Sequence, residues 1–453
     1  MKVVVIGAGV AGLAAARRLE ALTPEAEIVV VERDTVPGGK LRTERADGFV
    51  IEEAADSFLA RKERGIGLAE ELGLEDELVA RRPEHHRTYV RRGEDLLPLP
   101  EGLTGMIPSN LDALERSALL SSQGRERFRA EIDVPVAPGD ADESVAAFVT
   151  RRFGREAYDT LVEPLMTGIY GGDGELMSLR ATFPQLRALE LEHGSLLRGM
   201  SDPAPSGRPP FLSLQRGMGS LVDRLVGTYE RTELRLGREA SRVAPGYVVE
   251  LEGGDTIDAN GLILATPAHS TAVLLADLDG ELAAAHAEIP YASSVVVSLA
   301  YSRADVIPLD GYGYLVPRTE GSDVLACTWS SQKWEGRAPD EAVLVRVYAG
   351  RFGGADMTAL DDEELIAVAR DELRATGVAA EPVLARVRRW PQGMPQYVLG
   401  HSERVAAIEV ALAEHPGLAV AGAAYRGVGI PDCIASGEAA AESVARALSG
   451  APA

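Results

Sequence analysis

Three glycines near the start of the chain have the spacing of a loop that binds phosphate groups. Gly7, Gly9 and Gly12 follow a short apolar run and lead directly into a segment rich in Ala and Leu. A second apolar run, residues 28–31, ends at the acidic Glu32, twenty residues after Gly12. The order of strand, glycine turn, helix, strand and acid is the fingerprint of a unit that binds a dinucleotide.

Each part of this fingerprint has a physical role in holding an anionic cofactor. Gly7 allows a tight turn, Gly9 lets the backbone approach a pyrophosphate, and Gly12 lets the helix pack close to the sheet. The phosphates would lie at the N-terminus of the helix that starts near Val10, where free N–H groups and the helix dipole favour anions. Glu32 would accept a hydrogen bond from a ribose hydroxyl, which disfavours a 2′-phosphate.

Two further turns could contact the same cofactor. Gly38, Gly39 and Lys40 follow the ribose-binding strand, and a flexible basic turn there could cover the far side of a pyrophosphate. An ordinary surface turn would explain this stretch equally well. Near the C-terminus, residues 427–430 form a glycine-rich turn before an Ala-rich helix. We expect its backbone to approach the ligand, with a plain connection between strand and helix as the alternative.

A group of basic side chains stands out in a chain whose net charge is −23. It is either a strand and turn facing water or a patch that receives a polyanionic substrate through charge-assisted hydrogen bonds. The histidines in this stretch lack a third ligand at any metal-binding spacing, so no metal site is predicted. The group comprises Arg81, Arg82, His85, His86, Arg87, Arg91 and Arg92.

Composition narrows the class of protein. A length of 453 residues predicts two or three domains. The negative net charge argues against binding to nucleic acid or to an anionic membrane surface. No apolar stretch approaches the roughly 18 residues of a membrane span, and Lys2 is followed at once by a predicted strand rather than a signal peptide. The two cysteines, Cys327 and Cys433, exclude a disulfide framework, so we expect a cytoplasmic protein.

The pattern of elements predicts an α/β fold, which is of the α+β kind when the whole chain is considered. It has a Rossmann-like dinucleotide-binding domain, a β-sheet domain and a mainly helical inserted domain. Residues 289–390 read as an antiparallel sheet with helices on one side, and the stretch TGIYGGD reads as a glycine-rich loop. The predicted boundaries are 1–85, 215–288 and 390–453 for the dinucleotide-binding domain, 86–105 and 289–389 for the sheet domain, and 106–214 for the helical domain.

Five longer motifs resemble the bacterial protoporphyrinogen and coproporphyrinogen oxidases, and they occur in that family's order. The resemblance covers essentially the whole chain and is strongest to the soluble kind that oxidises coproporphyrinogen III. It implies an FAD domain, a β-sheet substrate domain and a helical domain. The motifs are GGKLRTERADGFVIEEAADSFLARK, LVEPLMTGIYGGD, LACTWSSQKWEG, RWPQGMPQYVLGH and GVGIPDCIASGEAA.

The resemblance implies which residues hold a non-covalent FAD. At one motif, which contacts the flavin in the family, this chain has Ala54-Ala55 in place of Gly-Pro, so the turn geometry there stays open. The other positions match more directly. The implied residues are Gly7, Ala8, Gly9, Val10, Ala11 and Gly12 at the diphosphate, Glu32 and Arg33 at the ribose, Gly39 and Lys40 in the basic turn, Ala54, Ala55, Asp56 and Ser57 beside the flavin, Val243 at the adenine, and Trp390, Val428, Gly429 and Ile430 at the flavin again.

The substrate side is implied in the same way. The family's substrate loop falls on Gly168 and Ile169, and its basic residue after SFL falls on Lys62, with Arg61 as the alternative. Arg87 is our own choice from the basic group. We expect Ile169 and Met166 to line an apolar slot for the flat macrocycle, with basic groups at its mouth for the propionates.

The implied reaction is the oxidation of coproporphyrinogen III to coproporphyrin III in haem biosynthesis, with molecular oxygen as acceptor and hydrogen peroxide as product. The resemblance implies a transient contact with a ferrochelatase of the same pathway, and no nucleic-acid partner or membrane span is expected. Protoporphyrinogen IX oxidation is the nearest alternative, followed by a flavin amine oxidase and a non-catalytic FAD-binding sensor. The acidic exterior disfavours a carotenoid desaturase, which would need an apolar surface facing a membrane.

Overall fold

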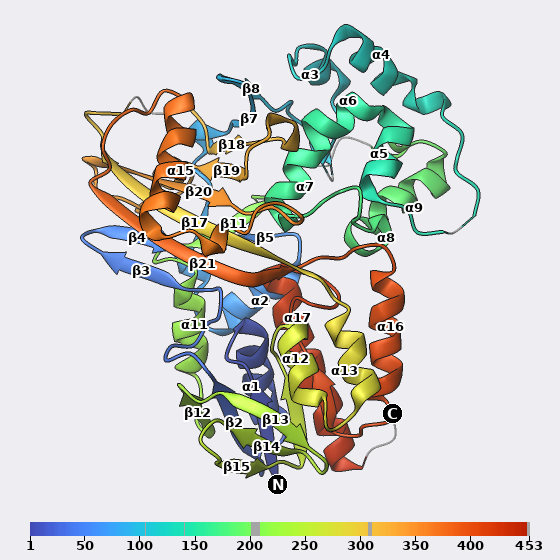
Figure 1. The fold of residues 1–453 in the computed structure, drawn as a ribbon, viewed down its shortest axis with the longest axis vertical. Helices are drawn as coiled ribbons and strands as arrows, with labels where there is room; N and C mark the ends of the chain where they lie inside the picture. The colour runs from blue at the N-terminus through green and yellow to red at the C-terminus, as the bar shows by residue number, and fades with distance from the viewer. Residues whose placement is uncertain (105, 140, 201–208, 307–309, 451–453) are drawn as a thin grey trace.

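The computed structural model describes residues 1–104, 106–139, 141–200, 209–306 and 310–450. The molecule is elongated, and the N-terminus lies in its lower part in Figure 1. Helices α1 and α17 occupy this lower region, a large sheet lies at the upper left, and a group of helices lies at the upper right. The predicted fold class, with a Rossmann-like part, a sheet part and a helical part, is confirmed.

The lower region is built on a five-stranded parallel sheet. Its central strands are apolar and fully buried, because helices cover both faces. The strands, in spatial order, are β12 (Thr232–Leu236), β2 (Glu27–Glu32), β1 (Lys2–Ile6), β16 (Gly261–Leu264) and β22 (Leu418–Val420). The helices of this region are α1 (Val10–Leu22), α2 (Glu63–Glu71), α11 (Gly219–Val226), α12 (Ala268–Leu275), α13 (Gly280–Ala287), α16 (His401–Leu412) and α17 (Ile430–Ser449).

Small residues allow α1 to pack tightly on its surroundings. A Cβ atom added to Gly12 would lie 1.9 Å from the carbonyl oxygen of Gly7. A Cβ atom added to Gly437 would lie 2.0 Å from the carbonyl oxygen of Ala11. Both distances are far below van der Waals contact, so these two glycines are required for the fold itself. The first turn of α1 is thereby held against the middle of α17.

The upper sheet has seven strands and draws on distant parts of the chain. All pairs are antiparallel except β18 with β7, which is parallel because β7 comes from a much earlier segment and no hairpin joins the two. The predicted antiparallel sheet is therefore right for its other pairs. In order the strands are β21 (Leu384–Pro395), β17 (Tyr291–Ser302), β20 (Ala342–Ala349), β19 (Val324–Thr328), β18 (Gly313–Leu315), β7 (Thr88–Arg92) and β8 (Asp95–Pro98).

The two faces of this sheet have different neighbours. Helix α15 (Asp362–Ala375) covers the face that carries Val345 and Val347 (Figure 1). Residues Leu344 and Ala300 belong to the opposite face, where they pack against the hairpin of β3 (Thr43–Ala46) and β4 (Phe49–Glu52). The sheet is thus buried on both sides, and charged residues on the second face lie inside the molecule.

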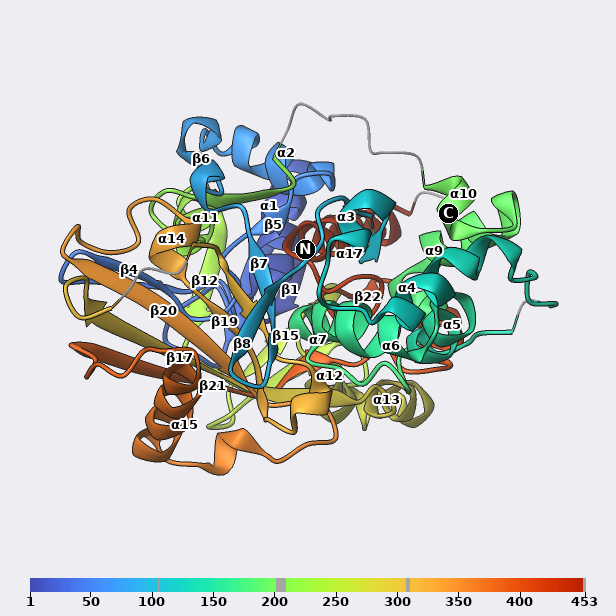
Figure 2. The ribbon, with the colours of Figure 1, turned by 90° about the horizontal axis from the view of Figure 1, so that it is seen from above.

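The helical region lies beside the sheet, with α7 next to β18 and β19 (Figure 2). Its core is apolar and separate from the cores of the other two regions. Its helices are α3 (Leu111–Glu115), α4 (Ser122–Arg129), α5 (Val145–Phe153), α6 (Arg155–Ala157), α7 (Glu163–Tyr170), α8 (Leu179–Thr182), α9 (Pro184–His193) and α10 (Leu196–Gly199). The exact domain boundaries stay a prediction.

Short strands and one short helix link these regions. The strands β5 (Phe58–Leu59), β11 (Phe211–Leu214) and β6 (Leu78–Ala80) form one sheet, β13 (Ala240–Ala244), β14 (Val248–Leu251) and β15 (Thr256–Asp258) form another, and β9 (Leu103–Thr104) pairs with β10 (Ile107–Pro108). The short helix α14 (Ser330–Lys333) follows β19.

One local prediction is wrong. The stretch TGIYGGD was expected to be a loop, but Gly168 and Ile169 lie in the last turn of α7. The helix ends only at Gly171, which has a left-handed conformation with φ of 60°. A left-handed glycine is a common way to end a helix. Gly168 is therefore tolerated within α7, whereas Gly171 ends the helix.

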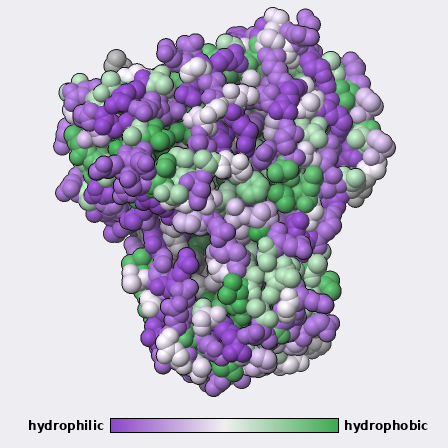
Figure 3. Space-filling view, in the orientation of Figure 1, coloured by the Kyte–Doolittle hydropathy of each residue, from purple (hydrophilic) through white to green (hydrophobic). Residues whose placement is uncertain are grey.

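Hydrophilic residues cover most of the face seen in Figure 3, and hydrophobic residues lie in separate groups on it. Across the described ranges of the chain, no helix combines the length and the apolar character needed to cross a bilayer.

Candidate functional site

The two glycine turns predicted to hold a pyrophosphate lie against each other. The N–H group of Gly38 donates to the carbonyl oxygen of Ala8 at 2.7 Å. A Cβ atom on Gly39 would lie 3.2 Å from the Cα atom of Gly9, so the turns touch through backbone. A Cβ atom on Gly9, by contrast, would meet nothing within 4 Å. Gly9 therefore faces open space at the N-terminus of α1, as a cradle for a phosphate group requires.

Glu32 closes this cradle at the end of β2. Its carboxylate accepts hydrogen bonds from the backbone N–H groups of Ala8 at 2.7 Å and Asp34 at 2.9 Å. Because each carboxylate oxygen can accept a second hydrogen bond, Glu32 keeps capacity for a ribose hydroxyl. Arg33 is exposed beside it.

Lys40 directly follows Gly39, and the residue is exposed in the structure. Its side chain keeps accessible surface, yet protein surrounds it closely enough that desolvation lowers the pKa of its ammonium. His269, at the start of α12, has a pKa lowered first by burial and then by the charges of Arg33 and Lys40. Positive charge therefore gathers beside the cradle, which suits a diphosphate.

Asp56 is the centre of an ion cluster. Its carboxylate accepts hydrogen bonds from the Lys333 ammonium at 2.9 and 3.0 Å, the Trp334 indole at 3.1 Å and the Ser57 hydroxyl at 2.7 Å. Burial opposes ionisation of this carboxyl, but the charges of Lys333 and Arg346 hold the pKa of Asp56 well below its usual range. Asp56 is therefore ionised across the physiological pH range.

The segment that contains Asp56 is also fixed through its backbone. Arg346 of β20 donates to the carbonyl oxygen of Ala54. The indole of Trp390 in β21 donates to the carbonyl oxygen of Glu53 at 3.0 Å. Ala55 packs against the core of the lower region. The upper sheet thus holds in place the segment that was predicted to lie beside the flavin, although the family's Gly-Pro is missing.

Lys62 and the C-terminal turn meet at Asp432. The ammonium of Lys62 donates to Asp432 at 2.7 Å, and the backbone N–H of Gly429 donates to the same carboxylate at 3.2 Å. Gly429 precedes α17, and Ile430 is its first residue. The preceding Val428 packs against the helical region. A residue predicted for the substrate and a turn predicted for the cofactor are therefore joined at one point.

Helix α7 presents one of its two predicted apolar residues to open space. Ile169 is 47% exposed, whereas Met166 is fully buried. A Cβ atom on Gly168 would lie 3.0 Å from Leu315 of β18, so this turn of the helix touches the sheet. The prediction that Met166 lines the slot is wrong, because α7 directs its side chain into the core of the helical region.

The basic group at residues 81–92 does not form one surface. Arg87 pairs with Asp310 at 3.0 Å, and both side chains are more than half exposed. Arg82 pairs with Glu84 at 2.7 Å and Arg91 pairs with Glu372 at 3.3 Å. Arg92 donates a hydrogen bond to the carbonyl oxygen of Leu119 at 2.7 Å. Arg81 lies between the rings of Phe211 and Tyr312. The role predicted for Arg87 stays a prediction.

Two predicted positions contribute little through their side chains. Val243 of β13 is fully buried, so its side chain offers no surface to an adenine in this structure. Val10 and Ala11 are buried in the first turn of α1, where their backbone N–H groups are the useful feature. Within the ranges that the structure describes, no three His, Cys, Asp or Glu side chains are grouped as a metal site.

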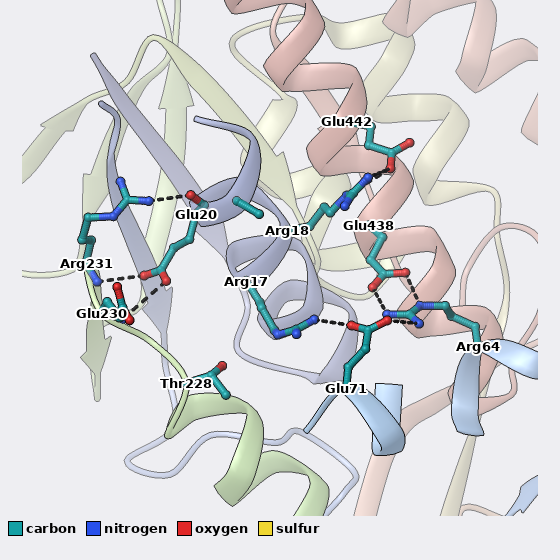
Figure 4. Close-up of a pocket in the computed structure, with 11 residues that line it drawn as sticks. Arg17, Arg18, Glu20, Arg64, Glu71, Thr228, Glu230, Arg231, Glu438 and Glu442 are labelled. Carbon is teal, nitrogen blue, oxygen red and sulfur yellow. Dashed lines mark hydrogen bonds and ion pairs between the residues drawn. The ribbon is translucent and has the colours of Figure 1, made fainter. Parts of the chain in front are cut away.

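A hollow of about 700 Å³ lies elsewhere on the lower region (Figure 4). Its walls come from α1, α2 and α17, more than a turn away from the glycine cradle. Arg17 pairs with Glu71 at 2.6 Å, and Arg64 pairs with Glu438 at 2.5 Å. Because these arginines are already paired with acidic side chains of the same hollow, we do not assign it to the site.

Sequence reasoning missed three residues of the site: Lys333, Arg346 and Asp432. The sequence contains a signal for two of them, Lys333 and Arg346. Lys333 is one of only four lysines in the chain and lies in the motif LACTWSSQKWEG. Arg346 interrupts the apolar strand VLVRVYAG, and a charge in such a strand is rarely buried unless it has a partner.

The chain matches the family described as flavin containing amine oxidoreductase over residues 10–445. It therefore belongs to this family, whose description names a flavin.

Comparison with individual relatives is more specific. The coproporphyrinogen III oxidase of Bacillus subtilis (strain 168) is 34% identical, over 97% of this chain and 96% of that protein. The enzyme of the same name from Staphylococcus aureus (strain NCTC 8325 / PS 47) is 32% identical over 98% of both chains. The predicted resemblance to this group is confirmed.

Solved structures agree with this placement. The crystal structure of a protein from Exiguobacterium sp. 255-15, assigned as a protoporphyrinogen oxidase, has a TM-score of 0.89 and 32% identity and covers 98% of both chains. Cyclohexylamine oxidase from Brevibacterium oxydans IH-35A has a TM-score of 0.71 at 18% identity, over 99% of both chains, and shares the fold.

Proposed function

We propose that this protein is an FAD-dependent oxidase that dehydrogenates coproporphyrinogen III to coproporphyrin III, with molecular oxygen as acceptor and hydrogen peroxide as product. The observation that carries the proposal is similarity along nearly the whole chain to proteins with this activity in their name. Coproporphyrin III formed in this way would serve haem synthesis. We place the protein in the cytoplasm, with a transient contact to a ferrochelatase.

The residues of the cradle fit a non-covalent FAD. Gly9 leaves the open space that a pyrophosphate would fill, and the N-terminus of α1 supplies N–H groups to it. Glu32 would hold the ribose, Lys40 would neutralise the diphosphate, and the turn before α17 would contact the flavin ring. When bound, the flavin supplies the acceptor for a hydride and passes the electrons to oxygen.

The chain's own residues would bind and orient the macrocycle. Ile169 offers an exposed apolar side chain beside Leu315, and a flat apolar ring can rest on such a surface. Lys62 carries a positive charge at the adjoining turn and would attract a propionate. Little acid–base machinery is needed, because the protons lost from the pyrrole nitrogens can pass to water. Positioning is thus the protein's main contribution.

Protoporphyrinogen IX is the second candidate substrate. The observation that favours it is the similarity to the Exiguobacterium structure assigned to that activity. Coproporphyrinogen III carries four carboxylates and protoporphyrinogen IX carries two, so positive charges around the slot favour the former. Amine oxidation has weaker support, since the likeness to cyclohexylamine oxidase concerns the fold alone.

The test is porphyrin fluorescence measured in air with each porphyrinogen supplied alone to the flavin-loaded protein. We expect faster growth of fluorescence with coproporphyrinogen III than with protoporphyrinogen IX at equal concentration. Faster growth with protoporphyrinogen IX would move the protein to the second activity. Fluorescence no faster than autoxidation with either substrate would reject both.

A further inference from the structure

A buried group of charges in the upper sheet carries more positive than negative charge. Arg81, Lys333 and Arg346 surround a single carboxylate, that of Asp56. The adjacent pair of Arg337 and Glu52, 3.6 Å apart, is neutral and does not correct the excess. Two positive charges therefore stay unbalanced inside a protein whose net charge is −23. Unbalanced buried charge is costly unless a ligand of opposite sign completes it.

Two of these cations also have unused hydrogen-bond donors. Arg346 is 1% exposed, yet its Nε and Nη1 atoms have no hydrogen-bond partner in the described part of the chain. The guanidinium of Arg81 lies 5.0 Å from the ring centroid of Phe211 and 4.7 Å from that of Tyr312, and it makes no ion pair within the described ranges. Stacking on ring faces leaves the N–H groups of a guanidinium free at its edge.

The backbone places Arg81 and Lys333 next to each other. The N–H group of Arg82 donates to the carbonyl oxygen of Lys333 at 3.0 Å, which joins the end of β6 to α14. The hydroxyl of Tyr312 donates to the carbonyl oxygen of Arg82 at 2.9 Å and fixes the same junction, which we call the corner between β6 and α14. The Lys333 side chain is 17% exposed, so part of it can be reached from solvent.

The register of the sheet brings this corner toward α7. Leu315, Ala326 and Tyr348 lie side by side on three strands, and their side chains share one face. Leu315 is the residue that α7 touches at Gly168. Arg346 lies two residues before Tyr348 on the same face, about 7 Å along the strand. A flat molecule lying against Ile169 could therefore extend a carboxylate to this corner.

We propose that Arg81 and Lys333 bind one carboxylate of the tetrapyrrole substrate, and that the positive charge of nearby Arg346 strengthens this binding. This inference rests on the proposed function and assigns a carboxylate site that is distinct from Lys62 and Arg87. Those two are already paired with Asp432 and Asp310, whereas Arg81 has no acidic partner at ion-pair distance among the residues that the structure describes. A planar guanidinium with free edge donors suits a carboxylate especially well.

The test uses Arg81→Met, because a methionine can keep its apolar stem between the two rings while the charge is lost. The matched control is Arg82→Met, which removes the neighbouring arginine, one that pairs with Glu84 instead. Binding of the product coproporphyrin III and of its uncharged tetramethyl ester is measured on the flavin-loaded protein by fluorescence quenching. The Michaelis constant for coproporphyrinogen III is measured in parallel.

Arg81→Met should weaken coproporphyrin III binding by about tenfold or more, the loss of one charge-assisted hydrogen bond, and leave ester binding nearly unchanged. Arg82→Met should change neither. Equal weakening of acid and ester, no weakening of either, or loss of flavin from Arg81→Met would overturn the proposal. Lys333→Met should repeat the pattern. Arg81→Lys keeps the positive charge but loses the planar guanidinium, so its affinity for coproporphyrin III should lie between those of wild type and Arg81→Met.

These outcomes are separable from failure of the proposed function. If the wild-type protein fails to oxidise coproporphyrinogen III, the function is rejected, whatever the variants bind. If the wild-type protein turns over and Arg81→Met binds the acid as tightly as wild type does, the function stands and the carboxylate site is rejected.

Discussion

The glycine-rich region around α1 and α17 and the charged region around β19 and β20 offer two different means of binding a ligand. The first uses backbone: Gly9 opens space, and helix N-termini point N–H groups into it. The second uses side chains whose partners are far apart in sequence, such as Asp56 and Lys333. Backbone recognition is encoded locally, whereas the charged region exists only after the chain has folded. The variants below separate the two regions.

The largest effect is expected within the glycine region itself. Gly12→Val should prevent folding, because its Cβ atom would overlap the carbonyl oxygen of Gly7, and such overlaps cost more than about 4 kcal/mol. Gly9→Val should fold normally and yet bind no flavin, because its side chain would fill the cradle. Flavin absorbance and thermal unfolding distinguish the two. A yellow, active Gly9→Val protein would contradict the assignment of Gly9 to the cofactor site.

The next effect compares two residues of α7. Met166→Ala should lower the free energy of unfolding by about 2–5 kcal/mol, because Met166 is fully buried. Ile169→Ala should leave stability almost unchanged and lower kcat/KM for the porphyrinogen, because its side chain faces open space. Urea unfolding and steady-state kinetics give both values. Equal loss of stability in the two variants would show that Ile169 is a core residue.

A smaller effect is expected at the point where the two regions meet. Lys62→Ala should raise the Michaelis constant for coproporphyrinogen III about tenfold while the flavin stays bound. Arg61→Ala is the control, since Arg61 is the exposed neighbour that could have held this role. If Lys62→Ala loses flavin and keeps its substrate affinity, Lys62 serves the turn before α17 and not the substrate.

The smallest effect concerns pH. Burial lowers the pKa of the Lys40 ammonium, and only the charged form neutralises a diphosphate. FAD affinity should therefore fall as pH rises through a value below the usual lysine pKa of about 10.4, by roughly a few-fold. Lys40→Gln should bind FAD more weakly and lose this pH dependence. An unchanged pH profile in Lys40→Gln would assign the dependence to another group.

Acid should act on the charged region. The pKa of Asp56 is lowered in the folded protein, so its contribution to stability is present above the carboxyl's unfolded pKa of about 3.9 and is lost as pH falls below it. Between pH 5 and 9 this group should leave stability unchanged.

The sequence predicts the glycine region well because its signals are local. Gly7 has the positive φ of a tight turn and Gly12 has the close packing that their spacing indicates. The charged region is less predictable, because Asp56 and Lys333 are 277 residues apart and only the fold brings them together. Met166 shows a different limit: a helix sends neighbouring apolar residues both to a core and to open space, and composition does not separate them.

The most direct test of the account is anaerobic mixing of the flavin-loaded protein with coproporphyrinogen III. The visible absorbance of the flavin should bleach faster than it does with protoporphyrinogen IX. Because one flavin accepts two electrons and conversion to the porphyrin removes six, most of the porphyrin absorbance should appear only after air is admitted. Admission of air should restore the flavin absorbance and release hydrogen peroxide. A flavin that stays oxidised in the presence of coproporphyrinogen III would contradict the proposed function.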